Sequence, residues 1–91
     1  MMQTTIYVVA VHEANDQIIQ LEDVDGVLYD GERFLYEKNI NAATFATLPD
    51  ETQTSMAIEF IPSTQGLSED GYFRTKESET TGKTLESLRR F

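Results

Sequence analysis

The sequence predicts a mainly β, α+β domain with an antiparallel meander of four or five strands. We expect the meander to form a curled sheet or small barrel, with one short middle helix and a short C-terminal helix. Three observations support this fold class. Runs of β-branched and aromatic residues, which favour strands, dominate the first half of the chain. Two Asp-Gly pairs, which are typical of hairpin turns, separate such runs. With 91 residues, of which 40% are hydrophobic, the chain is long enough for one core.

The first two strands are predicted from apolar runs on either side of a polar break. Within residues 4–12, the run Ile6–Val11 is entirely apolar, as in a central strand with both faces buried. Residues 13–16 are mostly polar and include turn formers, and residues 18–21 are again mostly apolar. This spacing predicts an antiparallel hairpin.

Two Asp-Gly pairs follow, Asp25-Gly26 and Asp30-Gly31. Each predicts a hairpin turn, because glycine adopts positive φ without steric cost. Only residues 27–29 lie between the pairs, so we expect a very short strand there, or a bulge in place of one turn. The apolar run 34–36 predicts a further strand, which would complete a meander over residues 4–37.

The middle helix is predicted over Ala42–Leu48, with Asn41 as its N-cap. Residues 56–61 then alternate between apolar and polar side chains, which predicts a strand that Pro62 ends. Residues 63–71 are rich in polar residues and glycine, which predicts a loop.

Charge divides the chain into an acidic β-rich domain, residues 1–73, and a basic C-terminal tail, residues 74–91. The first has thirteen acidic and two basic side chains, and the second has five basic and three acidic ones. Residues 77–82 contain no apolar side chain and predict a flexible linker. Leu85, Leu88 and Phe91 follow at i, i+3 and i+6, which predicts a short C-terminal helix. A helix of this length is stable only when it packs against another part of the protein or a partner. The expected docking residues are Leu85, Leu88, Arg89, Arg90 and Phe91.

Composition excludes several classes of ligand and location. A net charge of −9 argues against direct binding of nucleic acid or of an anionic membrane surface. The longest apolar run is far shorter than the roughly 20 residues needed to span a bilayer, and no basic residue precedes it as in a signal peptide. Without cysteine there is no disulfide framework or thiolate site. We therefore expect a cytoplasmic protein without a cofactor.

Three motifs that could indicate chemistry have simpler interpretations. Gly82-Lys83-Thr84 ends like a phosphate-binding loop, but Glu77 replaces the first glycine of that motif. Asp23-Val24-Asp25-Gly26 resembles part of a calcium loop, but Leu21 stands where the anchoring aspartate would be. His12 is the single histidine, and no nucleophile at a recognisable spacing accompanies it. The sequence therefore predicts neither a metal site nor an enzyme.

The remaining hypothesis is a protein-interaction module with an acidic binding face. The expected face consists of Glu22, Asp23, Asp25, Asp30 and Glu32. Its partner would be a basic protein surface, and the sharper version is an inhibitor or regulator that occupies a nucleic-acid-binding surface by charge mimicry, as mobile elements encode. The alternative is a structural subunit whose basic tail docks on the acidic body of the next copy, forming a homo-oligomer. An acidic surface also serves solubility alone.

Overall fold

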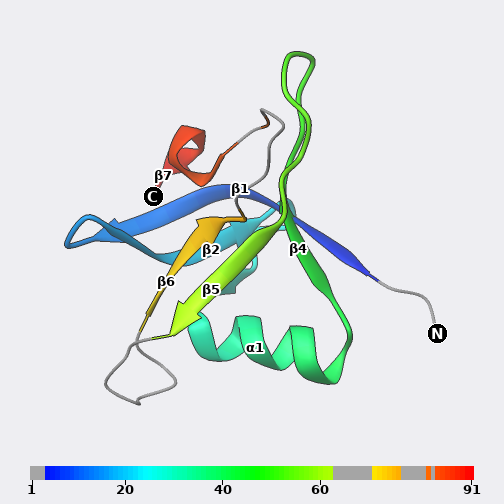
Figure 1. The fold of residues 1–91 in the computed structure, drawn as a ribbon, viewed down its shortest axis with the longest axis vertical. Helices are drawn as coiled ribbons and strands as arrows, with labels where there is room; N and C mark the ends of the chain where they lie inside the picture. The colour runs from blue at the N-terminus through cyan, green and yellow to red at the C-terminus, as the bar shows by residue number, and fades with distance from the viewer. Residues whose placement is uncertain (1–3, 63–70, 77–81, 83) are drawn as a thin grey trace.

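The computed structural model describes residues 4–62, 71–76, 82 and 84–91. In this part of the chain, seven strands form one mixed sheet, and one α-helix packs against it (Figure 1). The strands are β1 (Thr5–Ala14), β2 (Gln17–Asp23), β3 (Leu28–Tyr29), β4 (Thr44–Thr47), β5 (Ile58–Pro62), β6 (Gly71–Thr75) and β7 (Arg89–Arg90). The helix α1 spans Gly31–Ile40, and a 3₁₀ turn, η1, spans Leu85–Ser87. The predicted mainly β class is confirmed, whereas one α-helix is present in the described residues instead of the two helices expected.

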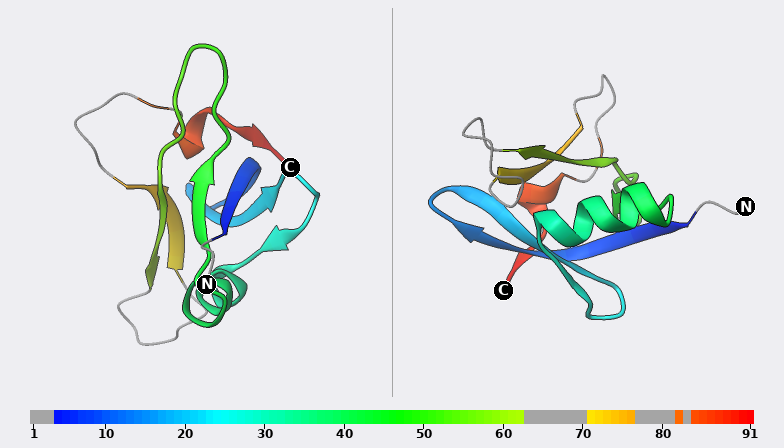
Figure 2. Two further views of the ribbon diagram at one scale, coloured as in Figure 1. Left: turned by 90° about the vertical axis from the view of Figure 1, so that its right-hand side faces the viewer. Right: turned by 90° about the horizontal axis from the view of Figure 1, so that it is seen from below.

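The sheet has the strand order β4-β1-β2-β6-β5, with β3 added to β2 and β7 added to β1. It curls strongly, so that its two ends approach each other (Figure 2). Ala46 and Ala57 form an isolated antiparallel bridge there, and the amide of Thr47 donates to the carbonyl oxygen of Met56 at 2.9 Å. The sheet nevertheless remains open, so the expected curled sheet is present but a closed barrel is not.

The β1–β2 hairpin is the element that the sequence predicts best. The two strands pair in antiparallel orientation, and Ala14 lies opposite Gln17. Asn15 and Asp16 connect them with φ angles of 52° and 63°. Two successive positive φ values are typical of the type I′ turn, whose twist matches that of the flanking strands. The predicted hairpin is therefore confirmed.

The two Asp-Gly pairs have different roles. Asp25-Gly26 forms the expected turn between β2 and the short strand β3, with φ of 83° at Gly26. Asp30, in contrast, is the N-cap of α1, and its carboxylate accepts from the amide of Arg33 at 2.9 Å. Aspartate is among the best N-cap residues, which explains this outcome. Gly31 is needed for packing, since a Cβ there would lie 2.5 Å from Cζ of Phe60.

The strand predicted for residues 34–36 is wrong, because these residues belong to α1. Phe34 is 1% exposed and occupies the centre of the core, where it packs against rings from three strands. Its centroid lies 4.4 Å from Phe45 of β4, 6.3 Å from Phe60 of β5 and 5.1 Å from Phe73 of β6. This aromatic cluster fixes α1 against the sheet.

The helix predicted for Ala42–Leu48 is also wrong. Residues 44–47 form β4, which pairs with β1 in parallel orientation from Thr5↔Thr44 onwards. Ala42 has φ of 54°, outside the right-handed helical region, and Phe45 and Thr47 point into the core. Because β4 and β7 are both parallel to β1, the all-antiparallel meander is corrected to a mixed sheet.

The expected C-terminal helix is reduced to the single turn η1, after which the chain becomes extended. Leu88 has φ and ψ of −82° and 158°, and the next two residues form β7 beside β1. Leu85 and Leu88, at i and i+3, are both buried in the core cluster. A 3₁₀ turn places such a pair on one side as a helix would. The expected linker 77–82 lies outside the described residues except for Gly82, as does the expected loop 63–71 except for Gly71.

Candidate functional site

Asp23, one of the five acidic residues expected on the surface, is buried at 6% exposure. Its Oδ1 accepts from the amides of Asp25 and Val27, both at 2.9 Å, and its Oδ2 accepts from the hydroxyl of Tyr29, also at 2.9 Å. Burial of the phenol, together with this hydrogen bond, raises the pKa of Tyr29 to about 12. Asp23 therefore holds the β2–β3 turn together and leaves Asp25 as the exposed acid of this turn.

Glu22 lies on the outer face of the sheet and pairs with the chain's own tail. The register places Arg89, Ala10, Glu22 and Leu28 in one row across β7, β1, β2 and β3. Nη2 of Arg89 lies 3.0 Å from Oε1 of Glu22, so this ion pair connects β7 and β2, the two strands that pair with β1 at Ala10. Part of the expected acidic face is thus occupied by the expected docking residues.

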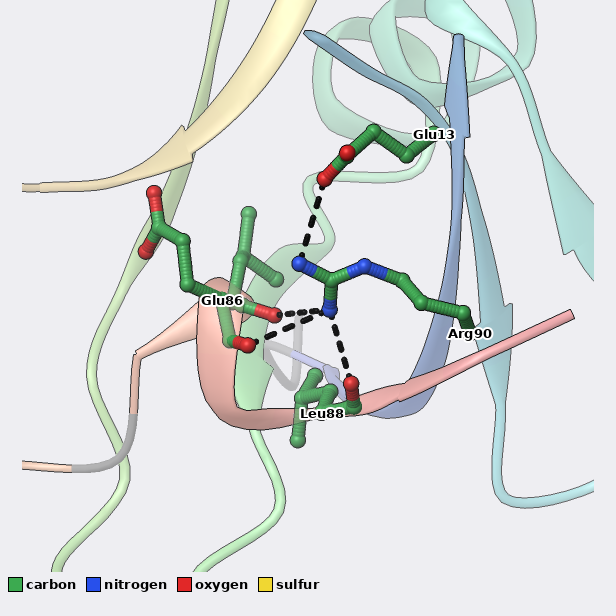
Figure 3. A network of polar contacts seen from close by, with 5 residues as sticks. Glu13, Glu86, Leu88 and Arg90 are labelled. Atoms are coloured by element: carbon green, nitrogen blue, oxygen red, sulfur yellow. Dashed lines mark hydrogen bonds and ion pairs between the residues drawn. The ribbon is translucent and has the colours of Figure 1, made fainter. Parts of the chain in front are cut away.

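Arg90 holds the C-terminal segment, which we define as residues 84–91, in two ways (Figure 3). Its Nη1 donates to the carbonyl oxygens of Leu85, Glu86 and Leu88, at 3.3, 3.2 and 2.8 Å. Its Nη2 donates to Oε2 of Glu13 at 3.2 Å. One guanidinium therefore bonds three carbonyl groups in and just after the short turn η1, and it joins the segment to the end of β1. Of these carbonyl oxygens, that of Leu85 also accepts from the amide of Leu88 at 3.1 Å.

Phe91 completes the docking of the C-terminal segment. Its amide donates to the carbonyl oxygen of Val11 at 3.0 Å, and its own carbonyl oxygen accepts from Nδ1 of His12 at 2.6 Å. The two rings are tilted, with centroids 5.5 Å apart. His12, considered first as a possible catalytic residue, thus contacts the C-terminal segment. All five expected docking residues contact the body of their own chain.

A groove of about 540 Å³ lies between β2, β3 and α1. It is lined by Gln20, Leu28, Asp30, Glu32, Arg33, Tyr36 and Glu37, and we call this surface the acidic groove. Two of the expected acidic residues, Asp30 and Glu32, line it. Leu28 and Tyr36 add apolar surface, because they are 46% and 55% exposed.

The lining of the acidic groove has more acidic than basic side chains. Among the described residues, the carboxylates of Asp30, Glu32 and Glu37 have no ion-pair partner. The guanidinium of Arg33 instead lies over the Tyr29 ring, 5.6 Å from its centroid. Three carboxylates beside one arginine and two exposed apolar side chains form a surface that suits a cationic group with an apolar neighbour.

Sequence reasoning missed Leu28, Tyr36 and Glu37 as members of this surface. A signal was present, because Glu32 and Tyr36 are at i and i+4, which places them on one side of a helix. That signal has meaning only once residues 31–40 are known to be helical. The adjacent aromatic residues instead favoured a strand.

Comparison of the chain with protein-family models, curated proteins and solved structures finds no match. Of the helices in the described ranges, none is long and apolar enough to cross a membrane. No group of three or more acidic or histidine side chains that could hold a metal ion occurs among the residues that the structure describes. The site must therefore be interpreted from its own geometry.

Proposed function

We propose that this protein is a non-enzymatic protein-interaction module whose acidic groove binds a basic segment of a partner protein. The observation that supports this proposal is a set of three carboxylates, Asp30, Glu32 and Glu37, beside exposed apolar side chains. None of the three has an ion-pair partner in the part of the chain that the structure describes. Charged groups accelerate encounter and select the sign of the partner. The apolar side chains of Leu28 and Tyr36 supply the contact area that charge alone does not.

The partner expected from this chemistry is a segment with arginine or lysine next to a leucine or an aromatic residue. The chain contains an example of such an interaction, because Arg89 and Arg90 pair with Glu22 and Glu13 above the buried Leu85 and Leu88. The sharper proposal is that the partner's basic segment normally binds nucleic acid, and that this protein competes for it as an inhibitor or regulator.

The alternative proposal is a structural subunit that forms a homo-oligomer by exchanging its C-terminal segment. The docking contacts of residues 84–91 are made within one chain, so exchange would replace them with identical contacts from a second copy. The mass in solution at low and high salt separates the two proposals. A monomer at both salt concentrations supports the interaction module, and a dimer or larger oligomer supports the structural subunit.

The groove is tested with Asp30→Asn, Glu32→Gln and Glu37→Gln combined. Asparagine caps helices as well as aspartate does, so the fold should be retained. The matched control combines Asp16→Asn, Glu51→Gln and Glu86→Gln, which change the net charge equally at exposed positions outside the groove. The probe is a synthetic amphipathic peptide with alternating arginine and leucine, and its association rate is measured at low and high salt.

We expect the groove variant to bind the peptide at least tenfold more slowly at low salt and with a flatter salt dependence, while the control variant stays close to the native protein. Equal losses in both variants would show that only net charge matters. No loss in either would leave the acidic residues as a solubility surface. Competition with nucleic acid is tested on proteins that the immobilised native protein captures. Short duplex DNA should release them if this protein binds the surface that normally binds nucleic acid.

A further inference from the structure

A second cavity, of about 300 Å³, lies where another face of α1 meets β4, the start of β5 and the residue after β6. It is lined by Phe34, Lys38, Thr44, Phe45, Ala57, Ile58, Glu59 and Lys76, and we call it the lysine cavity. Figure 1 shows the elements that surround it, with α1 next to β4 and β5. None of its residues lines the acidic groove.

The inner wall of the lysine cavity is apolar and rigidly packed. The rings of Phe34 and Phe45 lie with centroids 4.4 Å apart at an interplanar angle of 34°. Both rings and the side chain of Ile58 are buried members of the core cluster. The cavity is therefore a place where the core approaches the surface. The two rings line its base but expose little area, 1% for Phe34 and 3% for Phe45.

Two lysines stand at the mouth of this cavity. Nζ of Lys38 lies 5.9 Å from the centroid of the Phe34 ring. Lys76 is held in position through its backbone, because its amide donates to the carbonyl oxygen of Ala57 at 2.7 Å. The two ammonium groups come from α1 and from the residue that follows β6, and the fold brings them to one cavity.

The charge at this cavity is opposite to that of the chain as a whole. Within the described ranges, neither Lys38 nor Lys76 forms an ion pair. Among the described residues, the carboxylate that lines the cavity is that of Glu59, and it is paired with Nε of Arg74 at 3.1 Å. The described lining therefore has two lysines without an ion-pair partner and one paired acid, a local excess of positive charge on a chain with a net charge of −9.

We propose that the lysine cavity binds a small apolar monocarboxylate. The carboxylate would accept hydrogen bonds from the ammonium groups of Lys38 and Lys76, and a small apolar body would lie against Ala57 and the small exposed part of Phe34 and Phe45. The volume is at the lower end of the range for ligand pockets, roughly 300–1,000 Å³, which selects a small ligand. The strong negative charge of the chain disfavours polyanions, since these meet repulsion over a longer range than a single carboxylate does.

The probe is 3-phenylpropionate, with 3-phenylpropan-1-ol as the uncharged analogue of the same shape. Backbone amide shifts are followed by NMR during titration of the intact protein. We expect saturable shifts at Lys38, Ala57 and Lys76 with the carboxylate, and at least tenfold weaker binding of the alcohol. Raising sodium chloride from about 0.05 to about 0.5 M should weaken binding of the carboxylate but not binding of the alcohol.

Three single variants assign the charges. Lys38→Gln and Lys76→Gln should each lower the affinity for the carboxylate about threefold and change the affinity for the alcohol little. Arg33→Gln is the control, because it removes an unpaired cation from α1 on the side of the acidic groove. Arg33→Gln should leave the affinity for 3-phenylpropionate unchanged. Circular dichroism verifies that each variant is folded.

Several results would overturn the proposal. Equal affinity for the carboxylate and the alcohol would make the cavity an unselective apolar site. An affinity for the carboxylate that survives both lysine substitutions, or shifts confined to the acidic groove, would place the ligand elsewhere. Absence of any saturable shift up to the solubility limit of 3-phenylpropionate would also reject it. None of these results depends on the proposed protein partner.

Discussion

The C-terminal segment and the acidic groove both join charged side chains to apolar ones, but they use them differently. In the segment, Leu85 is fully buried and Leu88 is 7% exposed, and the arginines above them are paired with glutamates. In the groove, Tyr36 is 55% exposed and the carboxylates are unpaired. The segment resembles an interface that is already formed, and the groove resembles one half of an interface. A cluster of acids therefore indicates a partner only after the pairs within the chain have been identified.

The largest expected effect separates the two regions by stability. Leu85→Ala removes a fully buried side chain and should lower the free energy of unfolding by about 3 kcal/mol. Tyr36→Ala, in the groove, should cost less than about 1 kcal/mol because its side chain is largely exposed. Urea unfolding of both variants measures the difference. Similar costs would mean that the segment is not part of the core.

A second prediction concerns Tyr29, whose ring lies beneath the guanidinium of Arg33 at the acidic groove. Its pKa is raised from 10.0 to about 12, so the folded protein keeps a proton that the unfolded chain loses. Stability from this group is complete below pH 10 and is lost as the pH rises from 10 to 12. Tyr29→Phe should lower stability by about 1 kcal/mol at neutral pH, and it should remove this part of the alkaline decline. The measurement is thermal unfolding as a function of pH, and an unchanged decline in the variant would contradict it.

The smallest predicted effect compares two arginines of the same segment. Arg90→Gln should cost about 1 kcal/mol, because it removes donors from three carbonyl groups as well as an ion pair. Arg89→Gln should cost within about 0.5 kcal/mol, since its ion pair with Glu22 is exposed. Only the small effect of Arg89→Gln should vanish at high salt. If both variants behave alike, ion pairing explains the docking and the capping of η1 contributes little.

Sequence was sufficient for elements that are specified locally. The β1–β2 hairpin was predictable because apolar runs surround a turn whose residues adopt positive φ. Residues 31–47 were not, because their structure depends on partners far away. The helix α1 has no clear apolar period, and Phe34 is buried by three strands that the sequence does not place together. Likewise β4 is a strand because β1 accepts it as a parallel neighbour.

The acidic groove could be predicted only in part, because charge is visible in the sequence but burial and exposure depend on the fold. Charge alone identified Asp30 and Glu32, which line the acidic groove. It also selected Asp23, which burial and three hydrogen bonds withdraw from the surface. Leu28 and Tyr36 could be recognised only from the fold, because exposure of an apolar residue is a property of its neighbours. The lysine cavity could not be predicted from the sequence at all. Lys38 and Lys76 line one cavity only because the fold places α1 near the end of β6.

The pairing of β7 with β1 has a consequence for the folding and solubility of the chain. β4 covers one edge of β1 over residues 5–8, and β7 continues along that edge at Ala10 and Val11. Without β7, an apolar stretch of β1 would present unpaired amide and carbonyl groups, which is the arrangement that templates intermolecular β-aggregation. This edge of β1 is thus protected by residues that lie far from it along the sequence, so it stays unpaired until β7 has docked.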